Sequence, residues 1–193
     1  MKRLSYSRSL TIHRMPPHRH PSQFSRQVVE TVVILLLAAG VHEAWRAGIV
    51  SPAAICWIVT ALALAKTTFF FVENLQHILL ATSHEIPYHR FLALMGVNMA
   101  QITVSFALDF FLLEAAEPES FAGFAAGLGE PRILFDCFFY SLLNFTFFGF
   151  GDITPQSIPA KLVTLMEVTL AFFTVIFLLS DFISLKDSLR GGR

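Results

Sequence analysis

Two glycines in the last third of the sequence could place backbone carbonyls around a cation. Gly149 and Gly151 are two residues apart and stand directly before Asp152. Glycine adopts positive φ without a steric penalty, so this spacing allows a backbone that alternates in handedness and turns successive carbonyl oxygens toward one axis. Such oxygens can replace the water shell of an ion. The chemistry that this stretch predicts is therefore ion coordination.

The residues ahead of the glycines predict a short helix that would support such a site. Pro131 can begin a helix that runs to about Thr146. The C-terminal end of a helix carries partial negative charge, which favours a cation next to it. The apolar stretch 131–148 is too short to cross a membrane and return as two spans. It is read as a re-entrant element, since non-helical backbone at membrane depth must be buried in protein or line water.

Residues 140–155 read YSLLNFTFFGFGDITP. They resemble the pore helix and selectivity filter of potassium channels, whose core pattern is T-x-G-[YF]-G-D. The segment Gly149-Phe150-Gly151-Asp152 matches that pattern, and the residues on both sides match its usual surroundings. The resemblance covers about residues 132–185, and Glu167 falls where two-transmembrane prokaryotic channels often carry a glutamate.

The resemblance implies a homotetramer, because a filter of this type needs four loops around one axis. It implies that K⁺ or another monovalent cation is the bound species, with no other cofactor. Its ligands would be the backbone carbonyls of Thr146, Phe147, Phe148, Gly149 and Phe150. The resemblance also gives Glu167 a pore-supporting role.

The sequence departs from the family ahead of the first glycine. The family places a second threonine where this chain has Phe147, and an aliphatic residue where it has Phe148. Phe147 has no hydroxyl to offer to the innermost ion site, so we expect an impaired inner site with Phe147 as a hydrophobic constriction. Phe148 is expected to point into the packing behind the filter. Ala171 replaces the hinge glycine of many relatives, which predicts an inner helix that bends less.

The composition predicts an all-α membrane protein. Of the 193 residues, 54% are hydrophobic and only 15% are charged, whereas a soluble domain has about 25% charged residues. Mean hydropathy is +0.61. We predict four spanning helices, with the re-entrant helix and filter between the third and fourth. The predicted spans are 27–46, 52–81, 89–114 and 158–185.

The distribution of charge predicts the orientation of the spans. Residues 1–29 contain six bases and no acid, whereas residues 114–130 contain four acids and no base. The positive-inside rule then predicts that both termini lie in the cytoplasm. The membrane that holds the spans is expected to be the plasma (inner) membrane. The Arg- and Ser-rich lead also fits an organelle transit peptide, and that alternative stays open. The basic lead lacks interleaved aromatic residues, so nucleic acid is not an expected partner.

These patterns divide the chain into four parts. Residues 1–26 form a basic cytoplasmic tail, and residues 27–85 form a pair of peripheral transmembrane helices. Residues 86–187 form the pore domain, and residues 188–193 form a second short cytoplasmic tail.

Charged residues inside the predicted spans need partners or a function. Lys66 and Glu73 are seven residues apart and share one helix face. They are read either as a sensor or regulatory cation site, or as structural ion pairs, including one between Lys66 and Asp109. Other titratable residues are expected at span ends or in the tail: Glu30, His42 and Glu43 at the interface, and His13, His18 and His20 in a loose cluster.

Several function classes find no support. No nucleophile–base pair, phosphate loop or metal spacing is recognisable, so an enzyme is not expected. Basic residues do not recur at every third position, as they do in arginine-rich voltage sensors. Cys56 and Cys137 are read as buried free thiols. A non-conducting scaffold or regulatory subunit derived from a channel remains the alternative to a conducting one, and Phe147 is the feature that distinguishes them.

Overall fold

The computed structural model describes residues 23–82, 88–124, 127, 129–149 and 151–191. Side chains are described within the range 26–179, apart from 77–91 and the gaps just given. Phe150 and the three tail histidines lie outside the described residues, so the expectations for them are not examined further.

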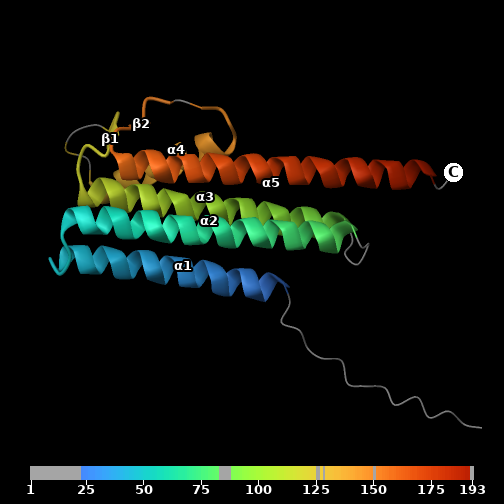
Figure 1. Cartoon of the computed structure of the whole chain (residues 1–193), viewed down its shortest axis with the longest axis horizontal. Coiled ribbons are helices and arrows are strands. Elements are labelled where there is room, and N and C mark those ends of the chain that lie inside the picture. Colours follow the sequence, from blue (N-terminus) through green and yellow to red (C-terminus); the bar gives the residue numbers. More distant parts are fainter. Residues whose placement is uncertain (1–22, 83–87, 125–126, 128, 150, 192–193) are drawn as a thin grey trace, which may run out of the picture.

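Four long helices lie side by side and alternate in direction (Figure 1). They are α1 (Gln23–Arg46), α2 (Pro52–Thr82), α3 (Tyr88–Ala116) and α5 (Ile158–Gly191). Each contains a stretch that is long and apolar enough to cross a membrane: Arg26–Arg46, Pro52–Gln76, Leu92–Ala116 and Ile158–Leu179. The prediction of an all-α membrane protein with four spanning helices is confirmed.

The core lies where α2, α3 and α5 pack together. Its fully buried side chains include Val59, Phe70, Phe106, Phe110 and Leu170. In contrast, α1 packs mainly against α3, and Gln27 is the one buried residue of its spanning stretch Arg26–Arg46. It is therefore a peripheral helix with a large apolar surface for lipid or for a further protein chain.

A fifth helix, α4 (Glu130–Phe145), lies between α3 and α5 in sequence and packs against both. Its first turn is set by Gly129 in an extended conformation, with Pro131 at an early helical position. At 16 residues it is about 24 Å long, shorter than a membrane span.

Two short strands join the two ends of the segment that contains α4. β1 (Phe121–Ala122) follows α3, and β2 (Thr154–Pro155) precedes α5. They pair antiparallel, with Phe121 opposite Pro155 and Ala122 opposite Thr154. The sequence predicted only an irregular outer loop around β1, and this pairing was not foreseen. It places the entry to α4 beside the exit from the glycine-containing loop (Figure 1).

Candidate functional site

The end of α4 carries the residues that the sequence singled out. The helix ends at Thr146, and the next two amides turn back onto it: Phe147 N–H donates to Asn144 O (3.2 Å) and Phe148 N–H to Leu143 O (3.1 Å). This pair of bonds defines a Schellman cap, in which the residue after the cap adopts a left-handed conformation. That residue is Phe147, with φ +56°.

The left-handed positions differ from the prediction. Gly149 has φ +53°, as expected, but Gly151 is not left-handed, so the expected alternation at both glycines is wrong. A Cβ at Gly151 would lie 3.1 Å from Leu143 Cδ1, a tight contact that a small shift of the Leu143 side chain would relieve. The second left-handed residue of this loop is Phe147, where a bulky side chain makes the conformation costly.

The two phenylalanines ahead of Gly149 have different surroundings. The Phe147 ring contacts Phe172 of α5 edge to face, with centroids 6.5 Å apart. The Phe148 side chain is 82% exposed. The expectation that Phe148 packs behind the filter is therefore wrong for the single chain, because its own chain supplies almost no contact there.

Backbone carbonyls of this loop are the predicted ligands of the cation. No donor among the described residues bonds to the carbonyl oxygens of Thr146, Phe147 or Phe148. Thr146 Oγ1 donates backwards to Leu142 O (2.8 Å), so its hydroxyl also belongs to the helix end. Asp152 is exposed, near the outer end of the loop.

A buried carboxyl group holds α4 in place. Glu167 of α5 is fully buried, and it contacts Ser141 and Asn144 of α4 (Asn144 Nδ2 to Glu167 Oε2, 3.2 Å). Tyr140 and Thr164 form a second link between the same helices at 3.2 Å. Glu167 therefore links α5 to the C-terminal half of α4.

The hydrogens around Ser141 can be counted. Ser141 Oγ donates to Thr103 O at 2.9 Å and also lies within hydrogen-bond distance of Glu167. A hydroxyl has one hydrogen, and a carbonyl oxygen can only accept. If the Ser141 hydrogen is used for Thr103 O, the contact between Ser141 Oγ and Glu167 becomes a hydrogen bond when Glu167 supplies the hydrogen. The site fits a carboxylic acid that donates to Ser141 and accepts from Asn144.

The outer end of the loop is held by a close approach of backbones. Gly123, directly after β1, has φ +103°, and a Cβ at this position would lie 2.1 Å from Asp152 O. Ser120 O accepts from both Gln156 N–H (2.8 Å) and Ser157 N–H (3.2 Å). Only glycine fits at position 123 while the strands stay paired.

The charged residues of the other spans pair with one another. Lys66 Nζ lies 2.6 Å from Asp109 Oδ2, which confirms the ion-pair alternative for these two residues. Glu73 instead pairs with Arg26 of α1 at 2.9 Å. The described residues contain no group of three acids, histidines or cysteines that could hold a metal ion. Cys56 and Cys137 are buried free thiols, as predicted.

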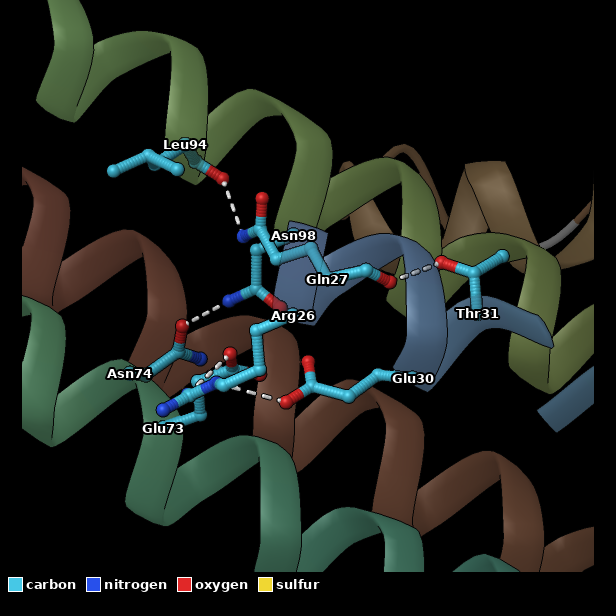
Figure 2. A network of polar contacts seen from close by, with 8 residues as sticks. All are labelled: Arg26, Gln27, Glu30, Thr31, Glu73, Asn74, Leu94 and Asn98. Atoms are coloured by element: carbon cyan, nitrogen blue, oxygen red, sulfur yellow. Dashed lines mark hydrogen bonds and ion pairs between the residues drawn. The ribbon is translucent and has the colours of Figure 1, made fainter. Parts of the chain in front are cut away.

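A buried amide network joins three helices, and the sequence did not reveal it. Asn98 of α3 donates to Asn74 of α2, whose amide donates to Thr174 Oγ1 of α5 (2.8 Å). Figure 2 shows this network beside Arg26, which lies between the carboxylates of Glu30 and Glu73. The sequence showed that these polar residues lie in apolar spans, but it did not show which residues they contact.

Residues near the ends of α1 only partly follow the expectation of an interfacial position. Glu43 is exposed, but Glu30 is half-buried and pairs with Arg26 (3.0 Å). His42 packs its ring between Trp45 and Phe111, with both centroid distances 5.6 Å.

Comparison with known families agrees with this geometry. Residues 100–186, from the middle of α3 to near the end of α5, match the model of a family described as "Ion channel". This segment is therefore similar to that family. The matched segment contains α4, the glycine loop and Glu167, whereas α1 and α2 lie outside the match. A search of curated proteins and of solved structures found no match.

Proposed function

We propose that this chain forms a homotetrameric cation channel that conducts K⁺ through the loop 146–152. The observation that carries the proposal is the β1–β2 pairing. It brings the start and the end of the α4–loop segment to the same place, so the segment enters and leaves the membrane from one side. The family match over residues 100–186 supports ion transport as the function.

The end of α4 supports coordination of a cation. The loop follows the C-terminus of the helix, where the partial charge is negative, and offers carbonyl oxygens that have no donor among the described residues. We take Thr146 to Asp152 as the filter, with Glu167 as the residue that supports it. The binding of K⁺ rests on the match of Gly149 to Asp152 to the G-[YF]-G-D part of the family pattern, since Phe147 stands at the place of the threonine.

The exposed faces support a tetramer. One chain supplies one filter loop, and four are needed to surround an ion. Large apolar side chains on α4, on α5 and in the loop between them are exposed in the single chain, among them Phe135, Phe139, Phe148, Phe172 and Leu165. Neighbouring chains would cover the part of this surface that does not face lipid or the pore. The charge distribution supports cytoplasmic termini and an acidic stretch on the outer side.

Flux into liposomes tests the proposal. The purified chain, verified as a tetramer by native mass spectrometry, is expected to pass K⁺ in preference to Na⁺, with block by Ba²⁺. Protein-free liposomes serve as the control. A folded tetramer that passes neither ion would contradict conduction, and equal K⁺ and Na⁺ flux would contradict potassium selectivity.

A second candidate is a non-conducting channel subunit that acts as a scaffold or regulator. Phe147 is the observation that favours it, because its ring lies against α5 directly below the filter loop and is only half-exposed. Four such rings around one axis would form an apolar constriction, and apolar constrictions close pores by excluding water. In this case the Ba²⁺-sensitive flux would be absent until Phe147 is replaced.

A further inference from the structure

A row of four phenylalanine rings connects α2 to the filter loop. Phe71 of α2 meets Phe173 of α5 edge to face, with ring centroids 5.3 Å apart. Phe173 contacts the neighbouring Phe172 at 6.0 Å, and Phe172 contacts Phe147 at 6.5 Å, both edge to face. Each distance is within the range of about 4.5–7 Å in which aromatic pairs stabilise each other. This aromatic row therefore runs from a helix outside the family match to the end of α4.

Buried polar contacts fix the end of the aromatic row that lies on α2. Asn74, three residues after Phe71, donates to Thr174 Oγ1 of α5 at 2.8 Å, and Thr174 directly follows Phe173. Both Asn74 and Thr174 are fully buried within the candidate spans, so sliding α2 along α5 would leave polar groups without partners. Phe177 of α5 also contacts Phe71, at 6.0 Å. These contacts hold Phe71 at one place on α5.

The other end of the aromatic row depends on the contacts that Phe147 makes. Its left-handed backbone is costly for a bulky residue, so the ring needs packing that holds it. The ring is half-exposed in the single chain, and Phe172 supplies its edge-to-face contact. Phe172 is half-exposed too, and its own ring lies against Phe173. The position of the Phe147 ring therefore follows from rings that α2 in turn supports.

We propose that Phe71 of α2 is a positioning residue for the ring of Phe147, and that it acts through Phe173 and Phe172. A displacement of α2 moves Phe173, which turns Phe172 and shifts the ring at the inner end of the filter loop. The inference rests on the proposed function, in which Phe147 forms a constriction. It gives α2 a direct route of contact by which its position sets the width of that constriction.

Fluorine NMR of the full chain in lipid nanodiscs tests the aromatic row. The probe is para-fluorophenylalanine at position 147, whose resonance responds to the ring currents of nearby aromatic rings. Phe71→Leu is expected to shift that resonance by more than its linewidth, and Phe71→Tyr, which keeps the ring, should leave it in place. Phe70→Leu is the matched control, because Phe70 is fully buried on the same helix and its ring contacts Phe69 instead. An equal shift in Phe70→Leu would indicate general loosening of the fold and overturn the proposal.

A second variant keeps the proposal open to refutation if Phe71→Leu fails to fold. Phe173→Leu interrupts the aromatic row at a partly exposed position and should shift the same resonance. When Phe173→Leu and Phe71→Leu are combined, the second change should add no further shift, because the path is already interrupted. An unmoved Phe147 resonance in Phe173→Leu, or in a folded Phe71→Leu, would overturn the proposal.

Flux of K⁺ into liposomes separates this inference from the proposed function. In a conducting channel, Phe71→Leu is expected to change the Ba²⁺-sensitive flux about twofold or more, whereas Phe70→Leu should leave it unchanged. A shifted Phe147 resonance in a chain that passes no ion in any variant would contradict conduction and still support the positioning role of Phe71. Flux that is the same in Phe71→Leu and in the unmodified channel would overturn the control of the constriction by α2.

Discussion

Phe147 serves two roles that place opposite demands on a side chain. Its backbone is the left-handed residue of the cap that ends α4, a position usually taken by glycine. Its ring packs against Phe172 of the inner helix. A non-glycine residue in this conformation costs about 1–2 kcal/mol, so the ring must be held by packing or serve the pore. Phe147 therefore marks a strained position at the inner end of the filter.

Two substitutions at Phe147 separate the ring from the turn. Phe147→Gly removes the ring and keeps the left-handed turn, so it should raise K⁺ conductance without loss of stability. Phe147→Thr supplies the hydroxyl found in relatives, but a β-branched residue fits the turn poorly and should lower the melting temperature. Single-channel recording and thermal unfolding measure the two effects. Unchanged conductance and selectivity in Phe147→Gly would exclude Phe147 as a constriction.

Glu167 is expected to tolerate an isosteric amide but not an apolar side chain. In Glu167→Gln the amide N–H can donate to Ser141, and the amide oxygen can accept from Asn144, so the hydrogen pattern around Ser141 is kept. Glu167→Leu leaves Asn144 without its acceptor and should cost about 1–3 kcal/mol. Thermal unfolding of the purified protein compares them. Similar losses in both variants would contradict the view that Glu167 carries a hydrogen.

At the scale of elements, the strand pair β1–β2 controls the outer end of the filter loop. Gly123 and Gly127 both have positive φ in the same segment, but only Gly123 lies against the backbone of Asp152. Gly123→Ala should therefore force the two strands apart and reduce K⁺ selectivity and stability. Gly127→Ala meets no atom within 4 Å and should show only the conformational cost of about 1–2 kcal/mol. Equal effects of the two variants on selectivity would refute this role of β1–β2.

The elements themselves were largely predictable. Apolar runs predicted the four spans to within a few residues, except at the C-terminal end of α5. The pair Ser51-Pro52 marks the start of α2, where Ala54 N–H lies 3.4 Å from Ser51 Oγ. Pro131 gave the start of α4. The strand pair was not predictable, because a pairing of two residues leaves no periodic pattern.

The site was only partly predictable. The family pattern singled out residues 146–152 and Glu167, whose roles as a filter and its support remain predictions. It did not give the partners Ser141 and Asn144, because a sequence shows the face of a helix and not which helix lies opposite. The left-handed Phe147 was missed for a different reason. Helix caps of this kind usually have glycine at the left-handed position. Here that position is occupied by Phe147, and the glycine, Gly149, comes two residues later.

At the scale of the whole molecule, polar contacts attach the peripheral helices to the segment that matches the ion-channel family. Lys66 of α2 pairs with Asp109 of α3, and Asn74 of α2 bonds to Thr174 of the inner helix. Between apolar helices in a membrane, such contacts and close packing hold neighbours together, because lipid is as apolar as the side chains. These polar contacts therefore add to the apolar packing of Val59 and Phe70, which also hold α2 against its neighbours.

A double substitution tests this attachment. Lys66→Met alone leaves the buried Asp109 without a partner and should destabilise the protein by about 3–5 kcal/mol. Lys66→Met with Asp109→Leu removes both charges and should recover most of the loss. The exposed pair Arg132–Asp136 is the control, since Arg132→Met should cost about 0–1 kcal/mol. Thermal unfolding in detergent measures all three, and a double variant no more stable than Lys66→Met would contradict the pairing argument.

The link between β1 and β2 also sets the order in which the chain can be completed during synthesis. Phe121 leaves the ribosome long before its partner Pro155, and α4 emerges before Glu167 exists to hold it. Until α5 has been made and inserted, α4 has no brace on that side and the loop cannot close. Because α5 is translated after α4, a chain released before α5 is made carries residues 146–152 without the contacts that hold α4 in place.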